Sequence, residues 1–362
     1  MLDPNKPYYD LPLLPPAQPL ESIDLLKSLV AASASLAELS ATAEHLPNQA
    51  ALFQSVILLE AKASSEIEQI VTTDDKLFGA ESPSKAIDPM TKEVHRYAQA
   101  INYGWSINKP LCTTVLEEVC SIIKGKPMTV RKVPGTALTD SVGKIVYMPP
   151  DGEKLLRDLL DNLFAWMNED NDIHPLIKAA VAHYQFESIH PFTDGNGRTG
   201  RIMVVLYLVE QKILSTPVLF LSGEILKHKS DYYSLLQETR ENNDFLTYLT
   251  WFVILTHNAS LRSTSRANQV RIAMLELKHE LRKLDPKMYS QDLVNALFRG
   301  PVIFANHLVE LGVVGSLSTA HLYLKKLEGA GIVFRAKQKF NRKVAYVNPR
   351  LLKALSGEID LS

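Results

Sequence analysis

The stretch IHPFTDGNGRTGR, from Ile189 to Arg201, lies between two helical patterns of apolar residues. Three glycines within it allow a tight turn and a close approach of the backbone to a ligand. The helix expected to follow has unpaired N–H groups in its first turn, and these attract anions. The stretch therefore predicts an anion-binding turn at a helix N-terminus. The glycines are Gly195, Gly197 and Gly200.

Charged side chains add to this turn. Arg198 and Arg201 are three residues apart on the first helical turn, so they lie on the same side and offer two planar forks of donors for phosphate oxygens. Asp194 would oppose an anion unless a divalent cation lay between them, so its carboxylate indicates Mg²⁺ held jointly by Asp194 and phosphate. An Asx-turn is the alternative role for this aspartate.

His190 ends the preceding helix, directly before Pro191. Its ring can take a proton from an incoming hydroxyl near neutral pH, although a helix cap is the alternative role. We expect Phe192 to be a buried anchor of the turn. The pattern GxxxxGK[ST] of a Walker loop is absent. Together these residues predict nucleotide phosphoryl chemistry, with a base that activates a nucleophile and fixed positive groups that stabilise the phosphate.

HPFTDGNGR, followed by Thr199, Gly200 and Arg201, resembles the Fic family signature HxFx(D/E)GNGRxxR. Fic proteins are mainly helical, and most transfer AMP from ATP to a hydroxyl side chain of a target protein. The resemblance thus implies a protein adenylyltransferase with a Fic helical bundle core, similar to stand-alone bacterial members that carry an N-terminal brake. The related Doc proteins have lysine at the position of Gly197 and phosphorylate their targets, so Gly197 favours AMP transfer.

The resemblance also implies a role for each residue of the signature. His190 is the catalytic base, Asp194 is the Mg²⁺ ligand, and Arg198 and Arg201 hold the triphosphate. Tyr233, in the segment YYSLL, is where relatives place an aromatic contact to the nucleotide, and core packing is the alternative role for it. The ATP-binding set is Glu68, Gly195, Asn196, Gly197, Arg198, Thr199, Gly200, Arg201 and Tyr233.

ASSEIEQI resembles the family's inhibitory helix motif (S/T)xxxE(G/N), with Ser64 and Glu68 in matching positions. A carboxylate paired with Arg201 removes the partner of the γ-phosphate, so Glu68 is expected to be an inhibitory residue. Gln69 departs from the motif, which has Gly or Asn there. A solvated glutamate is the alternative. The reverse reaction, in which Glu68 orients a water that removes AMP, uses the same residues.

The segment VPGTALTDSVGKIVYMPP predicts a hairpin of two strands, VPGTAL and KIVYM. It resembles the Fic flap, whose edge pairs with an extended segment of the target protein and aligns its hydroxyl. A purely structural hairpin is the alternative. Modification of the protein by itself is a further expectation, because its own hydroxyl groups have a high effective concentration.

The fold expected is mainly α, with a β-hairpin flap, an N-terminal helical segment and a C-terminal winged helix-turn-helix domain. The proline-rich start, YYDLPLLPPAQPL, predicts an extended strap. Three short helices and a basic hairpin predict the winged helix, with VIFANHLVELG as its second helix. The expected domains are residues 1–105, which include the inhibitory helix, residues 106–284, the catalytic core, and residues 285–362, the winged helix.

Overall charge is balanced, but Ser316–Lys353 holds nine Lys and Arg residues and one Glu. This asymmetry leaves open a DNA-binding regulator in which His321 and Lys325 reach bases and the Fic core senses nucleotide. The wing residues expected to meet phosphates are Lys337, Lys339, Arg342 and Lys343. Docking to protein, as in a homodimer, is the other use of a winged helix.

Cys112 and Cys120 fit one face of a helix, as small core residues. The sequence shows neither a basic and apolar N-terminal leader nor an apolar run of the ~18 residues that a membrane span needs. We therefore expect a cytoplasmic protein without membrane partners, which uses ATP as substrate and Mg²⁺ as cofactor.

Overall fold

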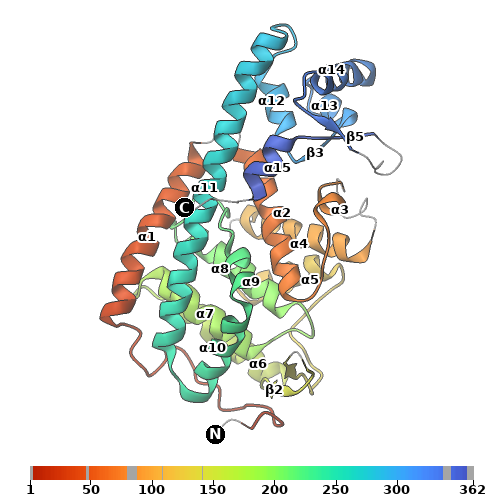
Figure 1. Cartoon of the computed structure of the whole chain (residues 1–362). Helices are drawn as coiled ribbons and strands as arrows, with labels where there is room; N and C mark the ends of the chain where they lie inside the picture. The colour runs from red at the N-terminus through yellow and green to blue at the C-terminus, as the bar shows by residue number, and fades with distance from the viewer. Residues whose placement is uncertain are drawn as a thin grey trace.

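The protein is described here from a computed structural model that covers residues 3–45, 49–79, 88–107, 109–140, 142–336 and 344–356. Within these residues the fold is mainly helical, as predicted, with two small antiparallel sheets (Figure 1). Up to residue 284 the elements are α1 (Ile23–Glu44), α2 (Gln49–Ile67), α3 (Asp74–Gly79), α4 (Pro89–Ser106), α5 (Thr113–Lys124), β1 (Leu138–Thr139), β2 (Ile145–Tyr147), α6 (Glu153–Met167), α7 (Pro175–Ile189), α8 (Asn196–Glu210), α9 (Leu221–Lys227), α10 (Lys229–Asn242) and α11 (Phe245–Leu284).

Residues 3–22, which precede α1, form no helix, in agreement with the expected strap. Their leucines, Leu11, Leu14 and Leu20, are buried in the core. Asn162 of α6 accepts a hydrogen bond from the Leu14 N–H at 2.8 Å and donates one to the Leu14 carbonyl at 3.0 Å. One amide side chain thus satisfies both backbone polar groups of Leu14.

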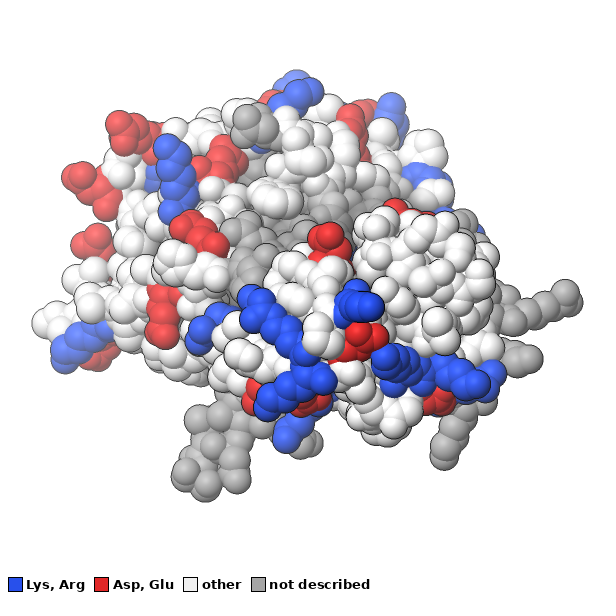
Figure 2. Space-filling model, turned by 90° about the horizontal axis from the view of Figure 1, so that it is seen from above, with Lys and Arg blue, Asp and Glu red and all other residues white. Residues whose placement is uncertain are grey.

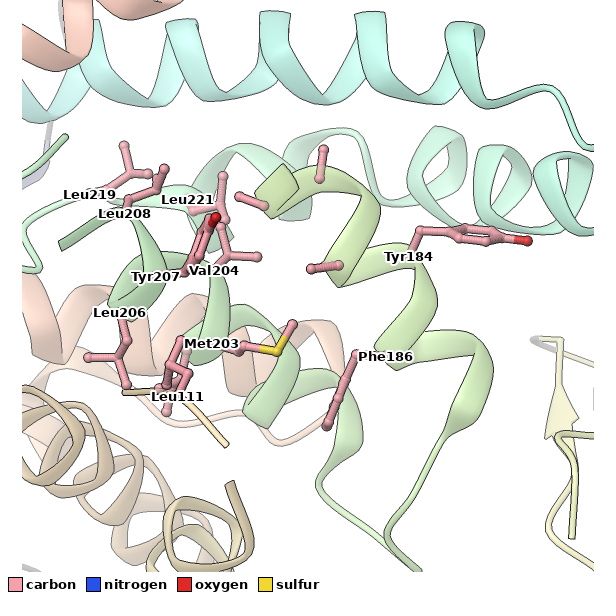
Figure 3. Packing of buried hydrophobic residues seen from close by; sticks show 14 of the residues in the cluster. Leu111, Tyr184, Phe186, Met203, Val204, Leu206, Tyr207, Leu208, Leu219 and Leu221 are labelled. Carbon is pink, nitrogen blue, oxygen red and sulfur yellow. The ribbon is translucent and has the colours of Figure 1, made fainter. Parts of the chain in front are cut away.

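Helices α7 and α8 are the centre of the core, and almost every residue in them is buried. Both helices carry buried side chains on all sides, which is typical of helices enclosed by protein. Figure 3 shows Phe186 of α7 and Met203 and Tyr207 of α8 among the buried apolar side chains. A Cβ at Gly200 would lie 2.9 Å from Oε1 of Glu187 on α7, so the glycine permits the two helices to approach closely.

The predicted hairpin is present but starts later than expected. Only Leu138–Thr139 forms the first strand, and Val133, at the expected start, is exposed. Leu138 pairs with Tyr147 and Thr139 with Ile145, with an irregularity between the two pairs. The hydroxyl of buried Tyr147 donates to the Ser188 carbonyl near the end of α7 at 2.9 Å, which fixes the hairpin beside that helix end.

The C-terminal part follows the predicted order of helices, with two differences. The segment expected as a second helix begins with a strand, because Val302 to Phe304 pair with a later strand in an antiparallel register. A last helix was also not expected. The three strands of this part form one sheet in the order β3-β5-β4. The wing residues Lys337, Lys339, Arg342 and Lys343 lie outside the described residues. The elements are α12 (Gln291–Leu297), β3 (Val302–Phe304), α13 (Ala305–Glu310), α14 (Leu317–Gly329), β4 (Phe334–Arg335), β5 (Ala345–Val347) and α15 (Pro349–Ser356).

The long helix α11 runs from the helical bundle to the C-terminal elements (Figure 1), and two large apolar clusters share it. Its residues up to Ala259 pack in the larger cluster, and those from Ala267 to Leu281 pack with the C-terminal elements. Val56 of α2 also belongs to the C-terminal cluster. One long helix and a side chain of α2 therefore join the two parts of the molecule.

Two smaller expectations concern the cysteines and the membrane. Cys120 is buried as predicted, whereas Cys112 is exposed because it is the N-cap residue of α5 and precedes the amphipathic face. None of the helices in the described ranges combines the length and the apolar character that a membrane crossing requires.

Candidate functional site

His190 lies at the junction between α7 and the glycine-rich turn. It ends α7 in the left-handed conformation, with φ of 49°, and its carbonyl accepts a hydrogen bond from Nε of the buried Arg131 at 3.0 Å. Its Nδ1 is buried and has no hydrogen-bond partner among the described residues. Burial, followed by the charges of Arg131 and Arg240, lowers the pKa of His190 to about 4. The ring is therefore neutral near pH 7 and can accept a proton.

The glycine-rich turn is shaped by Asn196 and Gly195. The Asn196 side chain accepts a hydrogen bond from the Phe192 N–H and donates one to the Phe192 carbonyl, both at 2.8 Å. Phe192 is fully buried, as predicted. Gly195 is the N-cap of α8 with φ of 88°, a conformation that favours glycine. The Asn196 side chain is thus committed to the turn, which leaves main-chain N–H groups of α8 to meet an anion.

Arg198 is buried, and it faces two carboxylates. Its guanidinium pairs with Glu93 of α4 and, at 3.4 Å, with Asp194. Lys124, the last residue of α5, contacts the same two carboxylates, Glu93 at 2.8 Å and Asp194 at 2.6 Å. Burial raises the pKa of Asp194, but the hydrogen bond from Lys124 and the charge of Arg198 outweigh it and lower the pKa. Asp194 is therefore an anion at neutral pH, and its side chain is half exposed.

Arg201 makes the contacts that the inhibitory motif implied. Its Nε donates to the Ser64 hydroxyl at 2.8 Å, and its Nη2 donates to the Ser64 carbonyl at 2.9 Å and to Oε1 of Glu68 at 2.8 Å. A Cβ at Gly197 would lie 2.2 Å from Oε1 of Glu68. The Glu68 carboxylate therefore lies against the first turn of α8, where a phosphate group would otherwise meet the N–H groups.

Glu68 is placed by the C-terminal end of α2. Gln69 has φ of 62°, its N–H donates to the Glu66 carbonyl, and the Ile70 N–H donates to the Ser65 carbonyl. These bonds form a Schellman motif, whose left-handed residue is usually Gly or Asn. Gln69 adopts this conformation in spite of its side chain. The turn therefore forms even though this sequence has Gln where the family motif has Gly or Asn.

Two buried glutamates near Arg201 had not been predicted from the sequence. Burial, the largest effect, raises the pKa of Glu60 and of Glu187 to about 7, although the charge of Arg201 opposes it in both cases. Glu60 accepts hydrogen bonds from the Ser222 N–H at 2.9 Å and from the Ser222 hydroxyl. Oε1 of Glu187 has no partner among the described residues. No local motif marks either residue, since each belongs to a helical pattern.

Three further residues of the expected site have different surroundings. Tyr233 is half exposed and lies over the ammonium of Lys229. Burial, then the charge of Glu68, raises the pKa of Tyr233, in agreement with a ring that lies near the Glu68 carboxylate. Thr199 is fully buried and, like Gly200, packs inside the bundle. These two residues therefore support the turn from behind and do not face the ligand side.

A metal site would draw on few protein ligands. No group of three or more His, Cys, Asp or Glu side chains is arranged to hold an ion within the described ranges. One carboxylate is nevertheless sufficient for Mg²⁺, which keeps several waters and is commonly bound through one or two carboxylates and substrate phosphates. Asp194 fits this description.

Profiles of known families match three successive parts of the chain. Residues 26–106 match "Fic/DOC family N-terminal", and residues 112–208 match "Fic/DOC family". The chain belongs to the Fic/DOC family. Residues 274–351 match "Protein adenylyltransferase SoFic-like, C-terminal domain". The family assignment thus rests on the N-terminal helices and the signature region as well as on the C-terminal part.

Relatives resemble this Fic protein in sequence or in fold. It is 32% identical to protein adenylyltransferase fic-1 of Caenorhabditis elegans over 115 residues, 29% of this chain and 22% of that protein. It is 32% identical to a probable protein adenylyltransferase of Aquifex aeolicus over 95 residues, 26% of this chain and 27% of that protein. The matches thus span about a quarter of the relatives' length. The crystal structure of a Fic family protein from Desulfovibrio desulfuricans G20 has the same fold, with a TM-score of 0.60 at 19% identity, over 92% of this chain and 98% of that one.

Proposed function

We propose that this Fic protein is a protein adenylyltransferase, which transfers AMP from ATP to a hydroxyl group of a target protein and releases pyrophosphate. The observation that carries the proposal is the position of His190, neutral at pH 7, directly before an anion-binding helix N-terminus. The relatives named protein adenylyltransferase support the same reaction.

The proposed reaction assigns one step to His190. The target hydroxyl oxygen attacks the α-phosphorus of ATP, and His190 takes the hydroxyl proton. The bond from the α-phosphorus to the bridging oxygen breaks, and pyrophosphate leaves with the electron pair. Main-chain N–H groups at the start of α8 and the guanidinium of Arg201 stabilise the charge on the phosphates. Mg²⁺, when bound, would neutralise phosphate charge, and Asp194 would hold it after Lys124 has moved away.

Glu68 is proposed to inhibit this reaction in the conformation described above. Its carboxylate occupies the guanidinium of Arg201 and lies against Gly197, so a γ-phosphate meets a negative charge and finds no free arginine there. ATP binding in the productive position then requires the Arg201–Glu68 pair to separate.

The position of the flap supports target docking beside His190. Tyr147 on β2 is bonded to Ser188, two residues before His190, and the guanidinium of Arg240 lies 4.5 Å from the centre of the Tyr147 ring. A target strand that adds to this hairpin would bring its hydroxyl close to the base. The protein itself is one candidate target.

The test compares wild type with Glu68→Gly and Glu68→Gly/His190→Ala. Each is incubated with Mg²⁺ and ATP labelled at either the α- or the γ-phosphate, alone and with a mixture of soluble proteins as acceptors. We expect α-label on protein to rise at least about tenfold in Glu68→Gly, because Arg201 is then free to bind phosphate. A factor of ten corresponds to about 1.4 kcal/mol. The label should vanish in the double variant.

The position of the label separates the alternatives. Transfer of γ-label would show phosphorylation, and the absence of both labels while ATP still binds to Glu68→Gly would contradict adenylyl transfer. Glu66→Ala, two residues before Glu68 at the end of α2, is the control, because Glu66 makes no contact with Arg201 among the bonds described and alanine keeps the helix end. It should leave the label at the wild-type level.

Two features of the described C-terminal surface argue against the DNA-binding alternative. Ser318, His321, Leu322 and Lys325 form its outward stripe, and Leu322, in the middle, is 65% exposed. Figure 2 shows Lys and Arg side chains on this end of the molecule with Asp and Glu side chains between them. Ser318, His321 and Lys325 are polar, but Leu322 offers no donor to a base edge, and carboxylates among the cations oppose binding to DNA phosphates.

A further inference from the structure

Helix α1 is apolar on two opposite faces, and only one of them is covered. Its inner face, which includes Leu25, Leu29 and Leu36, is buried and packs along α11 and the core. A helix that is apolar on all sides is normally enclosed by protein. Figure 1 places α1 at the outer edge of the molecule beside α11, so its outer face is open to solvent.

The outer face carries a continuous apolar stripe along the whole helix. Ile23 is 74% exposed, Leu26 43% and Val30 72%. Alanines continue the stripe at the spacing of a helix face, since steps of three and four residues return to the same side. The stripe is Ile23, Leu26, Val30, Ala34, Ala37 and Ala41, and all six side chains are exposed.

The stripe changes from large to small side chains halfway along α1. Two such helices that run antiparallel about a two-fold axis place the large half of each against the small half of the other. When Ile23 lies opposite Ala41 of a second copy, Val30 lies opposite Ala34. Alternation of large and small residues across an interface allows close packing without voids. The shape of the stripe is thus complementary to itself in the antiparallel arrangement.

Charges beside the stripe fit the same arrangement. Lys27 and Glu38 are exposed and lie on the same flank of the stripe, because eleven residues are close to three helical turns of about 3.6 residues each. In an antiparallel pair related by a two-fold axis, the same flanks of the two helices meet. The register that sets Ile23 opposite Ala41 sets Lys27 opposite Ala37, directly beside Glu38 of the second copy. Each interface then contains two Lys27–Glu38 pairs, related by symmetry.

We propose that the outer face of α1 is a homodimer interface, in which α1 of a second copy of this chain packs antiparallel in the register given above. The occupant is a second copy because both the sizes and the charges along the stripe are complementary to the stripe itself. The proposal is independent of the reaction proposed for the Fic site, because none of the stripe residues contacts that site.

The test measures the oligomeric state of the full-length protein by light scattering after gel filtration and by sedimentation over a range of concentrations. Wild type should be a dimer that dissociates on dilution. Val30→Glu should be monomeric, since it places a carboxylate in the centre of the interface. Circular dichroism is expected to show the same helix content for the variant, because Val30 is exposed in the monomer.

A charge exchange tests the register. Lys27→Glu and Glu38→Lys should each weaken the dimer about tenfold, because each brings like charges together, and Lys27→Glu/Glu38→Lys should restore it. Leu322→Glu, an equally exposed apolar residue on α14, is the control and should remain dimeric. A wild type that stays monomeric at all concentrations, or a Val30→Glu variant that stays dimeric, overturns the proposal. Failure of the double variant to restore the dimer overturns the register.

Discussion

At the scale of single residues, Gln69 bears on stability and on the proposed inhibition. It is the left-handed residue of the turn that presents Glu68 to Arg201, with φ of 62°. A side chain in this conformation costs about 1 kcal/mol relative to glycine. The turn nevertheless forms, since Arg201 binds Ser64 and Glu68 from one side and Lys229 donates to the Ile67 carbonyl at 2.6 Å from the other.

Gln69→Gly should therefore stabilise the protein by about 1 kcal/mol, because it removes the steric cost of the left-handed conformation. Urea unfolding measures the change. If Glu68 inhibits as proposed, labelling by the wild-type site should also fall in this variant, since the inhibitory turn is populated more fully. Gln69→Ala is the control: alanine retains a Cβ, so an equal gain from alanine would show that the conformation is not the cause.

Glu187 predicts a dependence of stability on pH. Its pKa is about 7 in the folded protein against 4.5 when exposed, so the folded state favours the neutral carboxyl. This contribution is fully present below pH 4.5 and is lost as the pH rises through 7. The Glu187→Gln side chain cannot ionise, so this variant does not lose stability in that way. The difference in free energy of unfolding, variant minus wild type, should therefore rise by a few kcal/mol between about pH 5 and 9, since each pKa unit is worth about 1.4 kcal/mol. Urea unfolding measures both proteins, and Glu276→Gln at an exposed position is the control for the substitution itself.

The signature residues could be predicted from the sequence because they are adjacent in it. The short spacing from His190 to Arg201 fixes a helix end, a turn and a helix start, and the structure has all three. The partners of Arg198 could not be predicted, because Glu93 is 105 residues away and lies on an ordinary amphipathic helix. Both arginines were expected to face phosphate; in the structure each is buried against carboxylates.

At the scale of elements, the Glu93–Arg198 pair joins α4 to α8. Arg198 is 2% exposed, so loss of its carboxylate leaves a buried charge without its main partner. We expect Glu93→Gln to destabilise the protein by about 3 kcal/mol. Asp158→Asn, which breaks the exposed Lys154–Asp158 pair, should change stability by less than about 1 kcal/mol. Equal effects on the unfolding midpoint would argue against burial as the source of the difference.

The lengths of the short strands were the weakest part of the sequence-based prediction. Helices such as α7 and α11 extend over many turns, so a helical pattern can be recognised in their sequences. The strand β3 has three residues, too few for an alternating pattern, and it exists because β5 pairs with it from more than forty residues away. The presence of β3 therefore depends on pairing between distant segments, which a local sequence pattern does not reveal.

At the scale of the whole molecule, α11 and Val56 join two apolar clusters, so we expect them to unfold together. The three tryptophans, Trp105, Trp166 and Trp251, lie outside the C-terminal cluster and report on the remainder of the molecule.

Leu277→Ala removes a buried side chain of the C-terminal cluster and should destabilise it by about 2–5 kcal/mol. If the clusters are coupled through α11, tryptophan fluorescence and circular dichroism should both shift to lower urea, with a single midpoint. Leu275→Ala, two residues away on the same helix but exposed, should shift neither by a comparable amount. A fluorescence midpoint that stays at the wild-type value while the circular dichroism splits into two transitions would show that α11 frays at its centre and that the C-terminal part unfolds by itself.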